Sequence, residues 1–410
     1  MRKVVVTGIG VVSPLGSDLN LFWDRLKSGY CGIGPLTSFD ASAMTSQIAG
    51  EIIEFDPNDF IPPKEQRRMD NFSKYAIGAA AMAVKDANLN MEEEDPTRAG
   101  VIVSSGIGGL STLEKQHSIY LEKGPGRCSP FMIPQMIVNI AGGLIAIEHN
   151  MQGPNYAIVT ACASGTHSIG NALNTIKYGD ADIMLAGGTE SSTTPMGVAG
   201  FCALRALSTR NDDPEHACRP FDKDRDGFIM ASGAGVVVLE EYEHAKARGA
   251  NIYCELSGYG ATCDAYHITA PTEDGAGAAR AMKQAISSSG MNPEDVDYIN
   301  AHGTSTPLND KMETNATKLA LGDASKKVMV SSTKSMTGHM LGAAGGVEAA
   351  VCALAIKNGV VPPTINHDNP GEGLDLDYVP KVSREADLKF CLSNSLGFGG
   401  HNASIGFKKI

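Results

Sequence analysis

The chain has 410 residues, and its 34 Lys and Arg against 46 Asp and Glu give a formal net charge of −12. The hydrophobic share of 42% and the lack of a G-x-y repeat among the 46 glycines exclude a disordered or collagen-like chain and indicate a large globular core. The acidic balance argues against general nucleic-acid binding, which needs basic surface to contact phosphates.

Nine cysteines are scattered along the chain without any C-x-x-C spacing, so neither a disulfide framework nor a zinc ribbon is indicated. The N-terminus lacks the apolar core and cleavage site of a signal peptide. The longest apolar runs, residues 137–147 and 349–356, fall far short of the roughly 20 residues that a membrane-spanning helix needs. We therefore expect a soluble protein without membrane contact, in the cytoplasm or, as a mature organellar form, in the stroma or matrix.

Short apolar runs recur along the chain, and each ends in a turn of Gly, Ser or Thr. They predict strands at residues 3–7, 100–104, 156–160, 183–186, 235–239, 252–258, 296–300, 328–332, 389–393 and 402–407. Near-continuous apolar runs of this length are typical of strands buried on both faces. Helical patterns lie between them, at residues 72–87, 166–178, 275–288, 311–320 and 345–357. This alternation predicts an α/β fold with helices layered on sheets.

A weak internal similarity divides the chain. Residues 155–164 and 327–336 each lead from a predicted strand through a small-residue turn into a helix, and residues 99–109 and 295–305 occupy the preceding slot. Two similar halves, residues 1–250 and 251–410, would produce this spacing, and so would chance resemblance between α/β units. No low-complexity linker separates the halves, so we expect one compact body.

The opening VTGIGVVSPLG (6–16) invites a dinucleotide-binding interpretation, because glycines after a strand let the backbone approach a pyrophosphate. The third glycine of that motif would fall at Ser13, however, and no acidic residue follows a second strand at the required distance. The pair Tyr242 and Lys246 has the spacing found in short-chain dehydrogenases but lies in a charged run typical of a solvated helix. A nicotinamide enzyme is therefore disfavoured.

Cys162 stands between a predicted strand and a predicted helix, in the small-residue turn TACASG. A helix N-terminus favours a thiolate and would lower the pKa of this thiol, and the free N–H groups of such a turn can hold an oxyanion. These features indicate a nucleophile. The alternative is an inert buried cysteine, which is the commoner role of a free thiol.

Two histidines lie in similar turns. His302 follows a predicted strand in NAHGTSTPLND, and His339 precedes a small-residue helix in KSMTGHMLGAAGG. Placed near a helix N-terminus, each would stay neutral and donate a hydrogen bond; the alternative is a packing histidine. Neither a P-loop nor H-E-x-x-H is present. One thiol with two neutral donors suits an enolate formed by decarboxylation of a malonyl thioester, and so carbon–carbon bond formation, if the three groups converge.

At these residues the chain resembles the elongating β-ketoacyl-acyl-carrier-protein synthases of the thiolase superfamily, and among them most resembles the type II synthases. The resemblance covers essentially the whole length. Its motifs are VVVTGIGVVSPLG, TACASG, RPFDKDRDGF, AHGTSTPLND, KSMTGHMLGAAGG and NSLGFGGHN.

The resemblance implies a five-layered αβαβα fold built from two duplicated halves, in a homodimer. It also implies an acyltransferase that joins malonyl-acyl carrier protein to an acyl-Cys162 intermediate in fatty-acid elongation, without a redox cofactor. The phosphopantetheine arm would arrive on the carrier protein. His302 and His339 would hold the malonyl thioester oxygen, and the backbone N–H groups of Cys162 and Phe398 would form the oxyanion hole.

Further roles follow from the resemblance alone. Lys334, with Glu313 as its expected partner, would organise the site. The remaining positions are the substrate contacts Thr304, Thr306, Ile107 and Gly399, of which the two threonines would hold the pantetheine arm and Ile107 would lie in the acyl pocket. A monovalent-cation site for Na⁺ or K⁺ would lie at Asn300, Glu348, Ser393 and Asn394.

Two further expectations rest partly on the residues themselves. Phe398, flanked by Gly397, Gly399 and Gly400, has the composition of a hinged gate. The basic residues Lys64, Arg67 and Arg68 form a cluster in an acidic chain, which suits docking of an acidic carrier protein; a solvated helix is the alternative.

Several relatives differ at these positions. A degradative thiolase would carry a second reactive cysteine, a starter-type synthase would have Asn at position 339, and a chain-length factor would lack Cys162. A stand-alone polyketide ketosynthase shares the triad and stays open as an alternative, as does, less favourably, a non-enzymatic carrier-binding protein.

Overall fold

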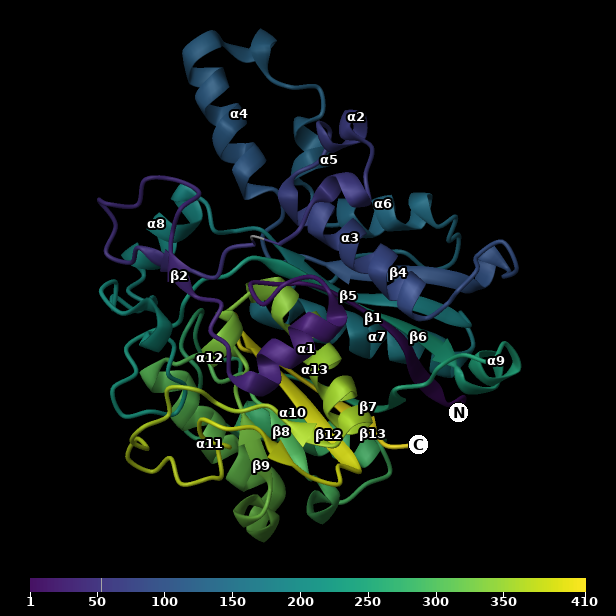
Figure 1. The fold of residues 1–410 in the computed structure, drawn as a ribbon, viewed down its shortest axis with the longest axis vertical. Coiled ribbons are helices and arrows are strands. Elements are labelled where there is room, and N and C mark those ends of the chain that lie inside the picture. The colour runs from purple at the N-terminus through teal and green to yellow at the C-terminus, as the bar shows by residue number, and fades with distance from the viewer. Residues whose placement is uncertain (53) are drawn as a thin grey trace.

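The computed structural model describes residues 1–52 and 54–410. Its main sheet has nine strands in the order β4-β5-β6-β1-β7-β13-β12-β8-β9 (Figure 1). These strands are β1 (Val4–Val12), β4 (Ala99–Ser104), β5 (Ile183–Glu190), β6 (Gly233–Glu241), β7 (Cys254–Cys263), β8 (Tyr298–Asn300), β9 (Met329–Ser331), β12 (Phe390–Gly397) and β13 (His401–Lys408). Two small ribbons pair β2 (Gly34–Pro35) with β3 (Ile48–Ala49) and β10 (Val360–Val361) with β11 (Arg384–Glu385).

The main sheet consists of two half-sheets with the same internal order. In the first, β4 and β5 are parallel, β5 is antiparallel to β6, and β6 is antiparallel to β1; in the second, β8, β12, β13 and β7 repeat this pattern. Within the described residues, the half-sheets join only through β1 and β7, at the pairs Val5↔Glu255 and Val6↔Cys254. The predicted α/β fold with two similar halves is therefore confirmed, whereas the boundary at residue 250 stays a prediction.

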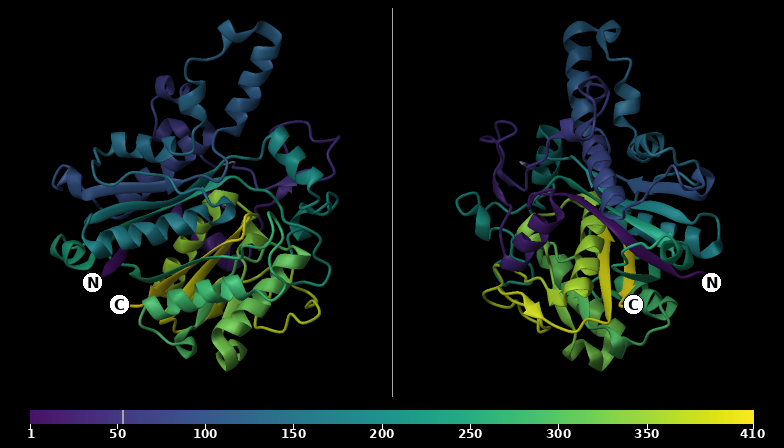
Figure 2. Two further views of the ribbon diagram at one scale, coloured as in Figure 1. Left: turned by 180° about the vertical axis from the view of Figure 1, so that it is seen from behind. Right: turned by 45° about the vertical axis from the view of Figure 1, so that its right-hand side comes forward.

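Helices complete the layers on both sides of each half-sheet. They are α1 (Leu19–Ser28), α2 (Pro63–Gln66), α3 (Asn71–Asp86), α4 (Leu110–Lys123), α5 (Met132–Met136), α6 (Ile140–Glu148), α7 (Ser164–Tyr178), α8 (Pro195–Ala203), α9 (Tyr242–Ala247), α10 (Ala276–Ser288), α11 (Pro307–Leu321), α12 (Lys334–Thr337) and α13 (Ala344–Asn358). α7 and α13 pack on each other between the half-sheets, α3 covers the outer face of the first and α10 that of the second (Figure 2). α4 stands out from this body (Figure 1).

α13 is the most enclosed helix of the middle layer, with every residue from Ala344 to Ile356 buried. A helix that is apolar on all sides belongs in a core. Within residues 1–52 and 54–410, the stretch Leu341–Asn358 is the one helix long and apolar enough to cross a membrane by length and composition. Because 89% of it is buried inside the protein, that match is weak evidence for a membrane span.

The glycines of the N-terminal VTGIG motif serve helix packing. A Cβ at Gly8 would lie 2.2 Å from the carbonyl oxygen of Ala83, and one at Gly10 would lie 1.9 Å from that of Ala79. Both carbonyls belong to α3, which therefore lies directly on β1. This close approach accounts for the motif without a nucleotide.

The prediction of a buried strand at residues 156–160 is wrong. The segment makes only an isolated bridge to β4, between Asn155 and Val101, and Tyr156 and Val159 are 43% and 49% exposed. Its counterpart in the second half, β9, does pair with β8. An apolar run indicates that its side chains avoid water, but it does not show what they pack against. The pattern at residues 156–160 therefore could not distinguish an inner strand from an exposed edge segment.

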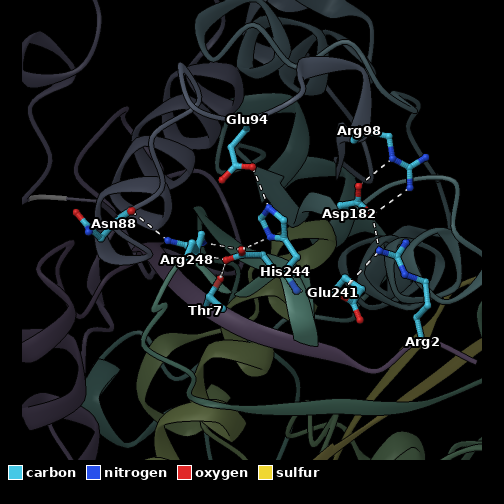
Figure 3. A network of polar contacts seen from close by, with 10 residues as sticks. Arg2, Thr7, Asn88, Glu94, Arg98, Asp182, Glu241, His244 and Arg248 are labelled. Atoms are coloured by element: carbon cyan, nitrogen blue, oxygen red, sulfur yellow. Dashed lines mark hydrogen bonds and ion pairs between the residues drawn. The ribbon is translucent and has the colours of Figure 1, made fainter. Parts of the chain in front are cut away.

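A polar network joins the adjacent strands β1 and β6 to α9 (Figure 3). Glu240 is fully buried and accepts hydrogen bonds from Thr7, Arg248 and His244, while His244 also contacts Glu94 at 2.9 Å. The hydrogen bond to Glu240, opposed by burial and aided by Glu94, raises the pKa of His244 to about 9. His244 is therefore a cation that helps to compensate the buried Glu240.

Candidate active site

Cys162 lies in a strained turn that leads into α7. The turn is a short 3₁₀ segment, Ala161–Ala163, and Ala161 has a φ of 50°, in the left-handed region that non-glycine residues rarely adopt. Ser164 holds it, because its hydroxyl accepts from the N–H of Thr160 and donates to the carbonyl of Ala161. The turn presents the thiol at the start of the helix, as predicted.

The loop between β12 and β13 lies against this turn. A Cβ at Gly397 would approach the carbonyl oxygen of Thr160 to 2.5 Å and the amide nitrogen of Cys162 to 3.4 Å, so only glycine fits there. Gly399 and Gly400 adopt φ values of 87° and 76°, which allow a sharp return into β13. Phe398, between these glycines, is half-buried and faces Phe201 at a ring-centroid distance of 6.4 Å.

Cys162, His302, His339 and Phe398 meet in one cavity of about 410 Å³. Thr304 and Thr306 line it too, and their hydroxyl oxygens are 3.0 Å apart. Other lining side chains are Phe201, Leu204, Arg205, Phe228, Asp264, Leu308, Met312, Leu341 and Asn402. The predicted convergence of the thiol with the two histidines is thus found in the structure.

The two imidazoles are held face to edge. Their ring centroids are 5.2 Å apart with the planes at 87°, and the Nδ1 atom of each is buried without a hydrogen-bond partner in the described part of the chain. The loop after β8 is fixed by Glu313, whose carboxylate accepts the N–H groups of His302 and Gly303, both at 2.8 Å. The backbone of His339 is fixed by Ile229, whose carbonyl accepts its N–H at 2.7 Å.

The electrostatics keep these three groups uncharged. Burial raises the pKa of Cys162 to about 12, although the positive charge of Lys334 opposes this, as do the backbone N–H groups of Cys162 and Phe398. The expected lowering of the thiol pKa is therefore not found, because desolvation outweighs the favourable dipoles. Burial, then the charge of Lys334, holds the pKa of His302 and of His339 well below the usual value. A protonated thiol beside neutral imidazoles leaves those nitrogens free to accept its proton.

Lys334 has a different partner from the expected one. Its ammonium group pairs with Glu348 on α13, and both side chains are almost fully buried. Glu313, predicted as its partner, instead accepts the two backbone N–H groups described above, and burial raises its pKa to about 7. The sequence separation of 14 residues between Lys334 and Glu348 spans a turn and a helix start, which no local pattern reveals.

Three oxygens near this ion pair have no hydrogen-bond partner within the described residues. They are the side-chain oxygens Asn300 Oδ1, Glu348 Oε2 and Ser393 Oγ, all buried. Unpartnered buried oxygens are the donor set that a hard cation prefers, so these residues fit the expected monovalent cation. The side-chain oxygen of Asn394 is already engaged, accepting from Ser404 at 2.9 Å.

The remaining predicted residues lie outside the cavity lining within the described chain. Ile107 is 40% exposed, although its loop contacts the Cys162 turn. Lys64, Arg67 and Arg68 are exposed in and after α2, where Arg68 pairs with Glu65 at 3.3 Å. Phe201 and Phe228, which line the cavity, were missed, because an isolated aromatic residue in a loop or short helix carries no signal of its own.

Residues 1–245 match the family model described as beta-ketoacyl synthase, N-terminal domain, and residues 253–368 match beta-ketoacyl synthase, C-terminal domain. A 3-oxoacyl-[acyl-carrier-protein] synthase 2 from Synechocystis is 54% identical over 100% of this chain and 98% of its own length. A protein of the same name from Staphylococcus aureus is 52% identical, over 100% of this chain and 99% of its own length.

Solved structures agree in fold. A beta-ketoacyl synthase from Burkholderia phymatum has a TM-score of 0.93 and 34% identity, covering both chains completely. A ketosynthase in complex with its type II polyketide acyl-carrier protein has a TM-score of 0.92 and 35% identity, again over the full length of both chains. The fold is thus the layered thiolase-like fold of these ketosynthases. With family matches in both halves and full-length relatives above half identity, the chain belongs to the beta-ketoacyl synthase family.

Proposed function

We propose that Cys162, His302 and His339 catalyse the decarboxylating condensation of an acyl group with malonyl-acyl carrier protein. The observation that carries the proposal is the convergence of one protonated thiol and two neutral imidazoles in a single cavity. The class of reaction is that of the family, a condensing acyltransferase of fatty-acid elongation.

The reaction has two stages. In the first, the Cys162 sulfur attacks the acyl thioester, the carrier leaves as a free thiol, and the proton of Cys162 passes through a neighbouring imidazole to that leaving thiol. In the second, malonyl-carrier loses carbon dioxide and the resulting enolate attacks the acyl-Cys162 carbonyl. The new carbon–carbon bond forms as the C–S bond breaks, and the Cys162 sulfur takes up a proton from solvent water.

His302 and His339 stabilise the enolate in this scheme. A neutral imidazole donates one N–H to the thioester oxygen, on which negative charge develops as carbon dioxide leaves. Burial, and after it the positive charge of Lys334, keeps both rings in that neutral form. The oxyanion of the first stage lies on the N–H groups of Cys162 and Phe398, the two backbone groups that already favour the thiolate. The Glu313 carboxylate holds His302 in place by accepting its backbone N–H.

The carrier protein enters the proposal through its charge and its arm. Lys64, Arg67 and Arg68 offer exposed positive charge that an acidic carrier would contact. Thr304 and Thr306 present hydroxyls inside the cavity for a phosphopantetheine arm. Phe398 and Gly399 would form the gate that admits the second substrate once Cys162 is acylated.

The chain is further proposed to act as a homodimer. The segment at residues 156–160 leaves the outer edge of the first half-sheet with exposed apolar side chains, among them Tyr156 and Val159. An exposed apolar edge is the surface that a second copy would cover. A Val159→Lys variant should shift the molar mass measured by light scattering toward the monomer.

A monovalent cation would complete the site. Asn300, Glu348 and Ser393 would hold it through their unpartnered oxygens, beside the Lys334 pair. When bound, it would add positive charge beside the Glu348 carboxylate, whose pKa is raised by burial.

One experiment tests the assignment of roles. The protein is incubated with acyl-carrier protein and then with malonyl-carrier protein, while the acyl adduct on Cys162 is followed by mass spectrometry and released carbon dioxide is trapped. We expect the wild type to form the adduct and release carbon dioxide, and Cys162→Ala to form no adduct. His339→Asn should slow decarboxylation more than acylation; equal loss of both steps would overturn the role of His339.

A polyketide ketosynthase would give the same adduct and the same gas. The chain is 52–54% identical to 3-oxoacyl-[acyl-carrier-protein] synthases and 35% identical to the polyketide ketosynthase. This difference favours fatty-acid elongation. Repeated condensation without intervening reduction would be the contrary result.

A further inference from the structure

Glu190, the last residue of β5, is fully buried beside the active site. Its carboxylate accepts five hydrogen bonds. The donors are the hydroxyls of Ser105 and Ser192, at 2.8 and 3.1 Å, and the N–H groups of Gly106, Ile107 and Gly342, at 2.9, 3.4 and 3.1 Å. No ion pair joins Glu190 to a basic side chain in the described chain.

Burial raises the pKa of Glu190, and the hydrogen bonds from its neighbours oppose this rise. The three backbone N–H groups can only donate, so they favour the ionised carboxylate over the protonated acid. Keeping an unpaired charge in a protein core is costly, and such groups concentrate at functional sites. A neutral amide side chain at this position could also accept hydrogen bonds from a single loop. The presence of a carboxylate therefore indicates a role beyond holding one loop.

The five donors belong to separate segments that meet at the nucleophile. Ser105, Gly106 and Ile107 come from the loop after β4, and Gly342 comes from the turn before α13. A Cβ at Gly342 would lie 2.4 Å from the amide nitrogen of Gly106, so the two backbones touch across the carboxylate. A Cβ at Gly106 would lie 3.2 Å from the carbonyl of Ala161, the neighbour of Cys162. Leu341, next to Gly342, lines the cavity with Cys162.

We propose that Glu190 is a positioning residue, which joins the Ile107 loop, packed against the Cys162 turn, to the Leu341 turn, which lines the cavity. The proposal rests on the proposed function, because it requires an acyl group on Cys162. It makes one carboxylate responsible for holding two segments, one from each half of the chain, against the nucleophile. Loosening either segment would misplace the thioester, and a misplacement of about 1 Å can cost about 100-fold in rate.

The charge of Glu190 also acts on the thiol. It raises the pKa of Cys162, whereas Lys334 lowers it, so the thiol lies between two opposing charges. Removing the Glu190 charge should therefore increase the thiolate fraction at a given pH. A residue that served packing alone would not change this fraction.

The test uses Glu190→Gln together with a matched pair, Ser105→Ala and Ser192→Ala. Each alanine variant removes one hydroxyl donor from the same carboxylate oxygen, but only Ser105 lies on the loop that packs against the Cys162 turn. Two readouts are taken for each variant: the rate of Cys162 acylation by long-chain and short-chain acyl-carrier protein, and the rate of Cys162 alkylation by iodoacetamide between about pH 7 and 9, where the thiolate fraction rises with pH.

We expect Glu190→Gln to slow long-chain acylation about tenfold or more. It should also speed alkylation, because loss of the Glu190 charge lowers the pKa of the Cys162 thiol. Ser105→Ala should slow long-chain acylation without changing alkylation, and Ser192→Ala should change either rate less than twofold. A folded Glu190→Gln with wild-type values of both rates would overturn the proposal. If that variant does not fold, equal acylation by the two alanine variants would overturn it.

These outcomes differ from a failure of the proposed function. If wild-type Cys162 took up no acyl group, the proposed condensation would fall, and the positioning role would fall with it. If the wild type is acylated normally but the Glu190 and Ser105 variants match it, only the positioning role is overturned.

Discussion

The Lys334–Glu348 pair makes a prediction about stability that separates the observed pairing from the expected one. The two side chains are only 2% and 3% exposed, so replacing Lys334 by Met leaves the Glu348 carboxylate without its cation in a low-dielectric core. Breaking a buried pair from one side typically costs about 3–5 kcal/mol. We expect Lys334→Met to lower the free energy of unfolding by about that amount.

The double variant Lys334→Met/Glu348→Gln removes both charges, so part of the loss should return. The coupling energy of the cycle is expected at about 1–3 kcal/mol, the range found for residues in one buried network. Urea unfolding of the wild type, the two single variants and the double variant measures it. The matched cycle pairs Lys334→Met with Glu313→Gln, and its coupling should be smaller because Glu313 bonds to backbone N–H groups.

A coupling to Glu313 that equals or exceeds the coupling to Glu348 would refute this assignment.

The Lys334→Met variant should also change the pH dependence of catalysis. Since the charge of Lys334 lowers the pKa of His302 and of His339, Lys334→Met should raise both. A protonated imidazole is the wrong form in this scheme, so the acid limb of the decarboxylation profile should move to higher pH. An acid limb at the wild-type pH would show that the charge of Lys334 does not control the protonation of the two imidazoles.

The pKa of His244 is about 9 in the folded protein, raised from its ordinary value of 6.5. The stabilisation that His244 gives the folded protein is therefore complete below pH 6.5 and is lost as pH rises through 9. His244→Gln should remove about 1–2 kcal/mol of this pH-dependent stability, a value reduced for solvent screening because the side chain is 25% exposed; parallel unfolding profiles of the two proteins between pH 6.5 and 9 would contradict it. Gly397→Ala should abolish the acyl adduct while the protein stays folded, because the added Cβ would lie 2.5 Å from the Thr160 carbonyl, and a normal adduct would contradict it. K⁺ or Na⁺ should raise the thermal midpoint of the wild type more than that of Ser393→Ala, with equal shifts as the contrary result.

The sequence predicted the elements that stabilise themselves locally. The buried strands around β5 and β12 and the helices α7 and α13 were found close to their expected bounds, because long apolar patterns report burial directly. Cys162 was found because a thiol in a small-residue turn has few structural uses. The exposed segment at residues 156–160 was misjudged because its apolar side chains are those of an edge.

Pairings across the chain escaped prediction for a different reason. Lys334 bonds to Glu348 and Glu190 bonds to Gly342, and neither contact follows from a local repeat or motif. Their energies depend on how the two halves fit together, and only the three-dimensional structure supplies that fit. The pKa of Cys162 was mispredicted on the same ground, since a turn in a sequence reveals its dipoles but not the depth at which it is buried.

The duplication itself explains why the chain has one nucleophile. Both halves build the same strained turn: Ala161 with a φ of 50° precedes Cys162 and α7, and Leu341 with a φ of 47° precedes Gly342 and α13. At position 342 no side chain fits, because a Cβ would lie 2.4 Å from the Gly106 nitrogen, and the N–H group is used by Glu190. In the first half the corresponding N–H, that of Cys162, faces the thiol. The N–H of Cys162 therefore stays available to the reaction at the thiol. The N–H of Gly342 is instead bonded to Glu190, which holds the segments packed around the Cys162 turn.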